Sequence, residues 1–573
     1  MNSEVLTGSF LHSPRLFQLA DRLVLSQPQR IHCRNLQGSA PAFLLNAVFQ
    51  HEMTSQLNHL VVCEDAESAA YLHNTLENLT GALDLFYFPS SFKNKKNYRL
   101  LNSSHVMLRT EALTRLSAAM RNPHAATGSH KKLLVTYPEA LFEKVVRPDA
   151  LSGNIISIKA GDTLDLNGMM EQFVEKGFER TDFVYEPGQF ALRGGILDIY
   201  SFGNEKPYRV ELFGNDVDSI RIFDPESQLS ERKLLQVNII PNVDTRVQTG
   251  EKISLLDFLP ENTVIWMQDW AFTKERLAIQ EEDLELFLQH MAEERERMAA
   301  QAAAAGSKSR AALAREAAAR EEEDKLEKKD ISRDEFVTAE EVSGQIKRCH
   351  VVEYGPSASG GIDGGEPFVI EFHTRPQPAF NRQFDLLIKD LKSWESKKYT
   401  LYLFAENPRQ LERLHTIFED LKAEIPFTPV PLSIHEGFID EDLKVVCYTD
   451  HQLFQRYHKY KVKQAYNKNK AITLRTLREL QPGDYVTHID HGVGVYSGLQ
   501  KIEANGRLQE AVRIIYKDSD ILYVNINSLH KISKYTGKDG TVPKVNKLGS
   551  DVWQKLKEKT KSKVKEIAFD LIK

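Results

Sequence analysis

Short apolar segments alternate with helical segments in the N-terminal part of the chain, and this alternation constrains the fold more than any other feature. The apolar runs are Asn58–Cys63, Leu83–Phe88 and Lys131–Tyr137, and a helical pattern through Leu72 and Leu79 follows the first of them. Parallel strands covered by helices produce such alternation. The sequence therefore predicts a parallel α/β domain over residues 1–154.

The first strand-to-helix turn of this domain has the layout of a phosphate-binding loop but lacks the side chains that bind phosphate. Residues 34–50 read RNLQGSAPAFLLNAVFQ, in which a strand enters a turn at Gly38 and Ser39 and an apolar helix follows. A working loop ends in Gly-Lys-Ser/Thr, whose lysine counters phosphate charge and whose hydroxyl binds Mg²⁺. Pro41 also removes one backbone N–H from the loop. We therefore expect a degenerate phosphate loop that survives as a scaffold.

The hydrophobic rhythm changes to period-two alternation over residues 155–241. Gly-Asn, Lys-Pro and Gly-Asn-Asp turns interrupt this alternation, which predicts an antiparallel meander. In the run PYRVELFG, the alternation places Arg209 and Phe213 on one face and Tyr208 and Val210 on the other. An arginine beside an exposed aromatic ring is typical of protein-binding surfaces, and a cross-strand pair or a covered edge gives the same pattern. Both interpretations remain open at this point.

Two charged stretches interrupt the folded pattern. Residues 290–345 are rich in alanine and charged side chains and have almost no apolar stripe. We expect a solvated helical insertion there, since a coiled-coil arm would need sustained apolar heptads. Residues 455–470, at the end of a second α/β pattern, combine basic and aromatic side chains. Nucleic acid could stack on such a run, although a solvated exit segment is its commoner meaning.

The C-terminal part reads as a small all-β domain followed by a helix. Short β-rich runs over residues 475–545 are separated by Gly, Asn-Gly and Asp-Ser-Asp turns, which suits a compact barrel. His488 and His491 stand three residues apart in it, and we interpret them as a structural corner rather than a metal site. Residues 546–573 are rich in lysine, with apolar side chains near helical spacing, and predict a connecting helix.

Composition excludes several classes of protein. The cysteines predict reduced thiols in a cytoplasmic protein and no metal site, because they are far apart and form no CxxC pair; they are Cys33, Cys63, Cys349 and Cys447. No apolar run reaches the length of a membrane span, and no signal-peptide pattern is present. A net charge of -6 with a pI of about 6.3 gives no overall nucleic-acid-binding character. At 573 residues the chain is too long for one core.

Two long motifs carry a resemblance to a known family. The runs EPGQFALRGGILDIYSFG and PYRVELFGNDVDSIRIFDPESQLS strongly resemble the signature shared by the excision-repair protein UvrB and the bacterial transcription-repair coupling factor. The runs GDYVTHIDHGVGVYSGL and KDSDILYVNINSLHKISKYTG resemble the RNA-polymerase-interacting module of the coupling factor, which is related to CarD-type regulators. The degenerate phosphate loop also favours the coupling factor, since UvrB keeps a working one. Tyr200-Ser201 departs from the usual Phe-Pro of the signature.

The resemblance implies a multidomain α/β architecture. It comprises a degenerate RecA/UvrB-like parallel domain, an inserted antiparallel UvrA-binding domain, a second small α/β domain, a small Tudor-like β-barrel and a linking helix. The implied boundaries are 1–154 for the nucleotide-fold domain, 155–241 for the UvrA-binding domain, 242–365 for a UvrB domain 1b-like part with the charged insertion, 366–470 for the small α/β domain, 475–545 for the barrel and 546–573 for the helix. Because the sequence stops at Lys573 within a helical pattern, we expect an N-terminal fragment of a larger protein.

The resemblance also transfers binding residues, position by position. The UvrA-contacting residues fall on Arg193, Arg209 and Phe213. The RNA-polymerase-contacting residues fall on Leu499, Ile502, Glu503, Val512 and Ile514, and Ile502 stands where the family has an apolar contact to the polymerase β subunit. No residue of this chain is expected to be catalytic.

The implied function is that of a non-catalytic adaptor that binds stalled RNA polymerase through its β subunit and recruits UvrA to damaged DNA. ATP, Mg²⁺ and double-stranded DNA would be bound by motor domains that lie outside this chain, so no cofactor is expected here. We expect a monomer without a membrane partner. The alternatives are a UvrB-like ATP-dependent helicase subunit and a CarD-like DNA-binding transcription regulator.

Overall fold

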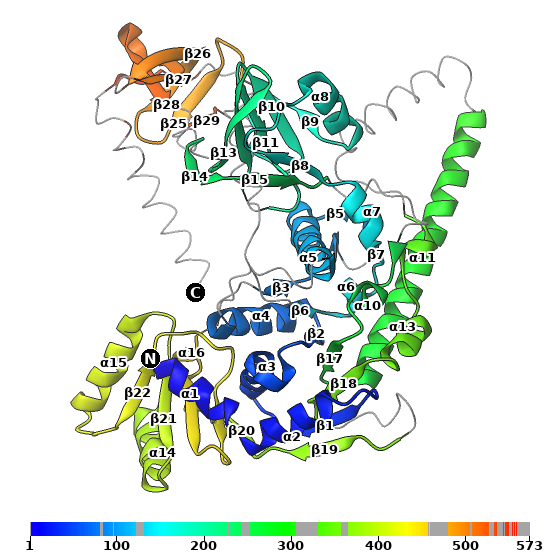
Figure 1. Ribbon diagram of the computed structural model, residues 1–573. Helices are drawn as coiled ribbons and strands as arrows, with labels where there is room; N and C mark the ends of the chain where they lie inside the picture. Colours follow the sequence, from blue (N-terminus) through cyan, green and yellow to red (C-terminus); the bar gives the residue numbers. More distant parts are fainter. Residues whose placement is uncertain are drawn as a thin grey trace. The chain divides into compact units, whose positions relative to one another are not determined.

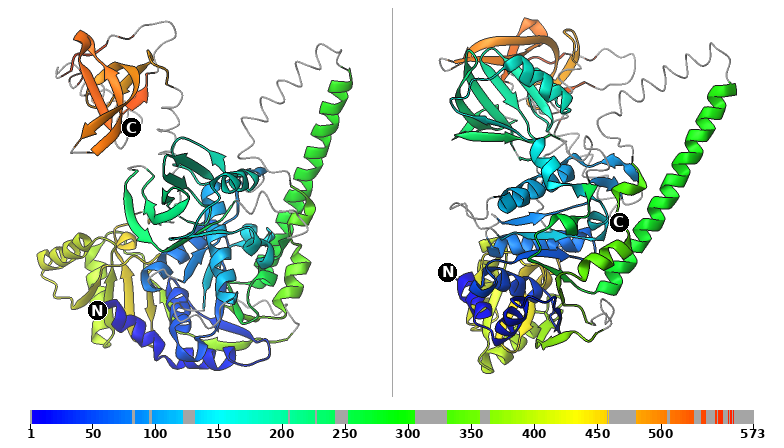
Figure 2. Two further views of the ribbon diagram at one scale, coloured as in Figure 1. Left: turned by 45° about the horizontal axis from the view of Figure 1, so that its top comes forward. Right: turned by 45° about the vertical axis from the view of Figure 1, so that its right-hand side comes forward.

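The computed structural model divides the chain into two compact units (Figures 1 and 2). The first unit comprises residues 1–155 and 242–463, and the second comprises residues 156–241 and 464–573. The structure describes residues 2–80, 84–94, 97–121, 131–204, 206–225, 228–241, 252–304, 331–356, 365–456, 458, 480–504, 507–525, 532–535, 543, 545–548, 553, 555 and 557.

A seven-stranded sheet forms the centre of the first unit, and every described pairing in it is parallel. The strands, in spatial order, are β19 (Phe368–Glu371), β1 (Arg30–Arg34), β18 (His350–Glu353), β17 (Thr263–Met267), β2 (Asn58–Val62), β6 (Leu133–Thr136) and β3 (Leu85–Tyr87). Strands β2, β6 and β17 are buried along their whole length, as their apolar runs require in a sheet covered on both faces. The predicted parallel sheet is thus confirmed, and β17, β18 and β19 join it from outside the predicted range of residues 1–154.

Helices and short hairpins surround this sheet. The helices are α1 (Asn2–Leu11), α2 (Pro14–Leu23), α3 (Ala40–Gln50), α4 (Ala66–Thr80), α5 (Ser103–Arg121), α6 (Pro138–Leu141), α7 (Pro148–Gly153), α10 (Leu255–Phe258), α11 (Trp270–Ala304) and α13 (Ala339–Ile346). Two short strand pairs accompany them: β4 (Phe92–Asn94) with β5 (Asn97–Leu101), and β7 (Val145–Val146) with β16 (Lys252–Ile253). Helix α11 extends well beyond the sheet in every view (Figures 1 and 2).

Only part of the predicted solvated insertion at residues 290–345 lies at the surface. Helix α11 does continue to Ala304, its residues 292–297 are exposed, and residues 305–330 lie outside the described residues. However, Phe336 and Val337 are buried, and Val342 on α13 is buried as well. The apolar side chains of residues 333–346 are therefore part of the core of the first unit.

A second, five-stranded sheet follows in the same unit. Its strands, in spatial order, are β20 (Thr374–Pro376), β23 (Phe438–Asp440), β24 (Val445–Thr449), β21 (Thr400–Phe404) and β22 (Phe427–Val430), with helices α14 (Phe384–Ser396), α15 (Pro408–Asp420) and α16 (Asp450–Leu453). The boundary expected at residue 366 differs from the sheet pairing, since β19 pairs with β1 in the first sheet. Phe404, Val430 and Phe438 belong to the same apolar cluster as Phe43 of α3. The two sheets therefore share one core.

The first part of the second unit is the meander. Its six-stranded sheet has the order β14 (Ser230–Leu234), β13 (Asp216–Phe223), β12 (Tyr208–Phe213), β11 (Ile196–Ile199), β10 (Gln189–Arg193) and β9 (Glu179–Arg180). The strands from β10 to β14 are antiparallel, as the turn spacing predicts. The pair β8 (Ile156–Lys159) and β15 (Gln236–Ile239) and helix α8 (Leu166–Glu175) complete it.

The second part is an antiparallel sheet that we call the C-terminal β-sheet. Its order is β28 (Ile521–Asn525), β27 (Arg507–Ile515), β26 (Gly492–Ala504), β25 (Tyr485–His488) and β29 (Ile532–Lys534). It has its own apolar core, which includes Val486, Tyr496 and Val524. The basic run at 455–470 and the connecting helix at 546–573 lie largely outside the described residues. No helix in the described part of the chain is long and apolar enough to cross a membrane.

Candidate functional site

The candidate phosphate loop lies at the carboxyl end of β1, where nucleotides bind in open parallel sheets. We call residues 36–40 the Gly38 loop. Gly38 has a φ of 56°, a left-handed conformation that glycine adopts freely, and the turn feeds directly into α3. Pro41 occupies the first turn of α3, where its missing N–H costs no helix hydrogen bond. The local geometry of a phosphate loop is therefore present.

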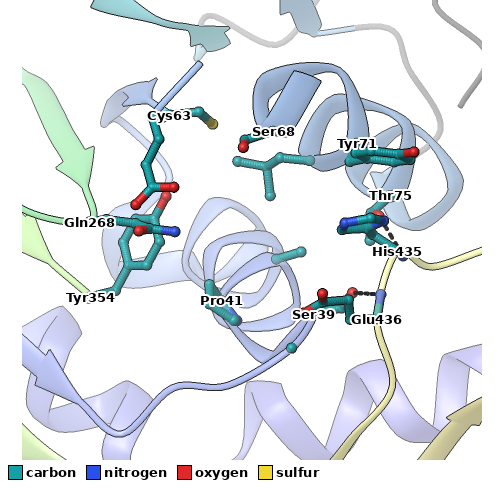
Figure 3. A pocket seen from close by; sticks show the side chains of 14 residues that line it. Ser39, Pro41, Cys63, Ser68, Tyr71, Thr75, Gln268, Tyr354, His435 and Glu436 are labelled. Atoms are coloured by element: carbon teal, nitrogen blue, oxygen red, sulfur yellow. Dashed lines mark hydrogen bonds between the residues drawn. The ribbon is translucent and has the colours of Figure 1, made fainter. Parts of the chain in front are cut away.

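A cavity of about 230 Å³ opens beside this loop, between the carboxyl edge of the sheet and α4 (Figure 3). Its wall contains Ser39 and Pro41 from the Gly38 loop and α3, and Glu64 and Tyr354 from the ends of β2 and β18. Burial and the neighbouring Asp65 raise the pKa of Glu64. The described wall contains no lysine or arginine, so it offers no side-chain cation to a phosphate.

The residues predicted to contact UvrA lie on the meander sheet, and a buried carboxylate organises two of them. Asp198 on β11 is 0% exposed, and its two oxygens accept hydrogen bonds from both arginines. Arg209 forms a bidentate pair, with Nε 2.7 Å from Oδ1 and Nη2 2.8 Å from Oδ2 of Asp198. Arg193 Nη2 lies 2.9 Å from Oδ2 of Asp198. The sheet thus holds two guanidinium groups around one acid.

Aromatic rings and a carbonyl fix both guanidinium groups further. Arg193 lies over the ring of Phe183 at 4.1 Å, and Arg209 lies over the ring of Phe223 at 4.3 Å. Arg209 also donates to the carbonyl oxygen of Gln228 at 2.9 Å. The side chain of Arg209 is consequently only 13% exposed, whereas that of Arg193 is 36% exposed. Of the two interpretations that alternation leaves open, this burial favours a covered cross-strand position for Arg209, since its side chain pairs with Asp198 on the adjacent strand.

Phe213 is the exposed member of the predicted set. Its side chain is 85% exposed at the end of β12, next to Gly214, whose φ of 64° turns the chain into β13. Strand alternation predicts Phe213 on the same face as Arg209 and Glu211, and the pairing of β12 with β13 has a register irregularity between Glu211 and Leu212. Glu211 pairs with Arg221 of β13 at 3.4 Å. The structure therefore combines a fixed charged face with one projecting aromatic ring.

The sequence analysis missed Asp198. An acid between two apolar residues, in the run ILDI, is the available signal, because a carboxylate in the middle of an apolar strand requires a cationic partner. Composition alone could not identify that partner, since Arg193 reaches it across a hairpin and Arg209 from the adjacent strand.

The residues predicted to contact RNA polymerase divide into two groups on the C-terminal β-sheet. Leu499 on β26 is 51% exposed, and the backbones of Ile502 and Glu503 continue the same strand, paired with β27. Val512 and Ile514 are fully buried in the core of the sheet. The core encloses these two side chains, so they present no exposed surface, and their assignment as polymerase contacts stays a prediction.

The histidine pair of this sheet forms a turn. His488 Nδ1 accepts a hydrogen bond from the backbone N–H of Asp490 at 3.1 Å, and the rings of His488 and His491 lie 4.8 Å apart. Within the described residues, no cluster of three or more histidine, cysteine, aspartate or glutamate side chains could hold a metal ion.

Comparisons with known proteins match both parts of the second unit. Residues 156–244 match the family model of the UvrB interaction domain, and residues 480–536 match that of the CarD-like/TRCF RID domain. The chain is homologous to the transcription-repair-coupling factors. It is 27% identical over 484 residues to the Transcription-repair-coupling factor of Bacillus subtilis (strain 168), an alignment that covers 77% of this chain and 40% of the relative.

Other coupling factors align over similar lengths. The protein of Staphylococcus epidermidis (strain ATCC 12228 / FDA PCI 1200) is 26% identical over 534 residues, which is 81% of this chain and 42% of the relative. That of Staphylococcus aureus (strain Mu50 / ATCC 700699) is 22% identical over 592 residues, which is 93% of this chain and 48% of the relative. The chain thus spans less than half the length of these coupling factors.

Proposed function

We propose that this chain is a non-catalytic adaptor of transcription-coupled nucleotide excision repair. Its meander (residues 155–241) receives UvrA, and its C-terminal β-sheet (within residues 475–545) receives the β subunit of RNA polymerase. The observation that carries the proposal is the exposed Phe213 ring, which projects from a charged and rigid face within the region that matches the UvrB interaction domain.

The geometry of the meander suits protein recognition. A projecting aromatic ring supplies a large apolar contact area, and it needs a rigid platform so that little entropy is lost on binding. The bidentate Arg209–Asp198 pair gives that platform, while the half-exposed Arg193 keeps donor capacity for a partner. We therefore assign Phe213 and Arg193 as direct contacts and Arg209 chiefly as a positioning residue.

The C-terminal β-sheet supports a second contact. Leu499 is exposed on β26, and Ile521 and Tyr523 on β28 are exposed apolar or aromatic residues of the same sheet. Tyr523 donates its hydroxyl to Oε1 of Gln500 at 3.2 Å, which ties β28 to β26. We propose Leu499, Ile502 and Glu503 as polymerase contacts, with Val512 and Ile514 supporting the strand from within.

The cavity beside the Gly38 loop does not favour the alternative function, that of an ATP-dependent helicase subunit. The motif lysine and the motif hydroxyl are missing from the sequence, and the described cavity wall carries Glu64 without a compensating lysine or arginine. We propose that ATP, Mg²⁺ and double-stranded DNA are handled by other parts of the coupling factors, and that this chain hydrolyses no ATP.

Replacing Phe213 tests the UvrA assignment directly. Truncation of a central interface aromatic typically costs about 2 kcal/mol, so the Phe213→Ala variant should bind UvrA about 30-fold more weakly by calorimetry. Leu235→Ala is the matched control, because Leu235 is 83% exposed in the same domain. Equal losses in both variants, or no loss in Phe213→Ala, would contradict the assignment.

The polymerase contact is tested in the same way on the other domain. The Leu499→Arg variant buries a charge in an apolar contact and should weaken binding to the isolated β subunit by tenfold or more, on the order of 1.4 kcal/mol. Ile489→Ala serves as the control, since Ile489 is another exposed apolar residue of the C-terminal β-sheet. Binding of UvrA should stay unchanged in both variants.

A further inference from the structure

The connection between β22 and β23 contacts the Gly38 loop. We call residues 433–437 of this connection the strap. The backbone N–H of Ser39 donates to the carbonyl oxygen of Glu436 at 3.2 Å, and the N–H of Glu436 donates to Oγ of Ser39 at 3.0 Å. These reciprocal bonds occupy a backbone N–H of the loop, a group that phosphate loops offer to their ligand, and the hydroxyl of Ser39 (Figure 3).

The strap packs closely against Gly38, which also lines the cavity. A Cβ placed on Gly38 would lie 2.5 Å from the carbonyl oxygen of Gly437. In nucleotide-binding loops glycine permits close approach of a phosphate, whereas here the group that approaches is a peptide carbonyl. Glycine is therefore required at this position by the strap itself.

Helix α4 holds the strap from the opposite side. The ring of Tyr71 stacks on the ring of His435 with a centroid distance of 3.7 Å and an interplanar angle of 16°. Thr75 Oγ1 accepts from the N–H of His435 at 3.3 Å, and Asn78 Nδ2 donates to the carbonyl oxygen of Ser433 at 2.8 Å. The strap thus lies between the Gly38 loop and α4, where His435 and Glu436 form part of the cavity wall.

The residues next to the strap anchor it in the core. Ile434 within the strap and Phe438 just after it are fully buried, and the ring of Phe438 lies 5.4 Å from that of Phe43 on α3. Gly437 is enclosed as well, because a Cβ on it would lie 2.0 Å from Oε1 of Gln377 and 2.7 Å from the carbonyl oxygen of Cys447. Leaving the loop would therefore require the second sheet to lose core contacts.

We propose that the strap is a built-in occupant of the former phosphate loop, which excludes nucleotide and joins the two sheets of the first unit as one body. A peptide carbonyl is neutral, so this occupant needs neither the motif lysine nor Mg²⁺ to balance its charge. The strap has then replaced phosphate as the group bound by the loop, and the loss of the motif lysine and hydroxyl is a consequence of that replacement. Their absence is not the only feature that prevents ATP binding. This inference is independent of the adaptor function.

Hydrogen–deuterium exchange of the whole chain tests the contact. Gly437→Ala forces the strap to shift, and Gly344→Ala on α13 is the matched control, since a Cβ on Gly344 meets no atom within 4 Å. We expect Gly437→Ala to speed exchange at least tenfold in residues 66–80 and in 36–43, with no change in the meander strands 189–223. Exchange in 66–80 and 36–43 equal to that of the Gly344→Ala variant would overturn the proposal.

Restoring the motif tests the exclusion of nucleotide. The triple variant Ala40→Gly/Pro41→Lys/Ala42→Thr places Gly-Lys-Thr at the start of α3. We expect it to bind no Mg-ATP by calorimetry while residues 66–80 and 36–43 keep the exchange protection of the wild type. Binding of Mg-ATP with that protection retained would show that ATP and the strap coexist, and would overturn the proposal.

Discussion

Asp198 lies beneath the candidate UvrA-binding face and pairs with both of its arginines. Its carboxylate is fully buried, so the cost of removing it from water is balanced only by the guanidinium groups of Arg193 and Arg209. The two arginines in turn keep fixed positions on the sheet. The arrangement of the face therefore depends on a residue that is fully buried beneath it.

Replacing this acid should cost more than replacing an exposed one. Asp198→Ala leaves Arg209 buried without its partner, and breaking a buried pair costs about 3 kcal/mol or more of the free energy of unfolding. Glu231→Ala removes an exposed pair with Lys206 and should cost less than about 1 kcal/mol. Denaturant titration of the meander, followed by domain-specific exchange, compares the two variants. Equal costs would show that Asp198 does not organise the face.

The residues of this face show what strand alternation can predict and what it cannot. Alternation predicts Arg209 and Phe213 on one face from local backbone geometry alone, and a register irregularity between Glu211 and Leu212 separates the two positions. Alternation did not indicate that Arg209 would be largely covered, since the cover comes from Asp198, Phe223 and Gln228, which are brought near by tertiary pairing. Exposure of a side chain is thus a tertiary property that the pattern alone could not supply.

Among the elements, α4 and the strap are joined by stacked rings that respond to pH. Rings of His435, His451 and His458 stack beside Tyr71. Burial first, and neighbouring histidines next, lower the pKa of His435 and of His458 to about 4, and burial with several neighbours lowers that of His451 to about 4. All three rings are therefore neutral in the folded chain at pH 7.

The sign of the pH dependence follows from these shifts. Between pH 6.5 and 4 the unfolded chain binds more protons at these histidines than the folded chain, so stability falls as the pH falls. Asp440 acts in the opposite direction, because burial raises its pKa to about 6 and its protonation favours the folded state on acidification. Burial also raises the pKa of Asp450, whose Oδ1 lies 3.9 Å from Nδ1 of His451. Three histidines thus oppose two aspartates, and we expect the histidines to dominate.

Exchange protection factors in residues 66–80, corrected for intrinsic rates, measure this effect. They should be lower at pH 5 than at pH 7, and the difference should shrink in His451→Gln, which removes one of the titrating rings. Protection that is equal at both pH values, or higher at pH 5, would mean that the histidine stack does not control this element.

Element boundaries were harder to predict than element types. The parallel sheet, the meander and the all-β character of the C-terminal region followed from hydrophobic period and turn residues. The charged pattern at 290–345 concealed the buried Phe336 and Val342, because a few apolar residues in a polar run give no clear period. Likewise, Val512 and Ile514 could not be separated from surface residues by resemblance, since a family motif marks core and contact positions alike.

At the scale of the whole molecule, UvrA and the RNA polymerase β subunit are proposed to bind separate domains of the second unit. The region of residues 156–244 and that of residues 480–536 match different family models and have different folds. The two contacts should therefore be independent, and a variant in one domain should leave the other partner's binding intact. Additive effects are expected for sites that share no contacting residues.

Mass photometry of this chain mixed with UvrA and the RNA polymerase β subunit is the most direct test. The account predicts a ternary complex with the wild-type chain, loss of UvrA alone with Phe213→Ala, and loss of the β subunit alone with Leu499→Arg. Competition between the two partners, or loss of both partners with either variant while Leu235→Ala and Ile489→Ala bind normally, would contradict an adaptor with two independent surfaces.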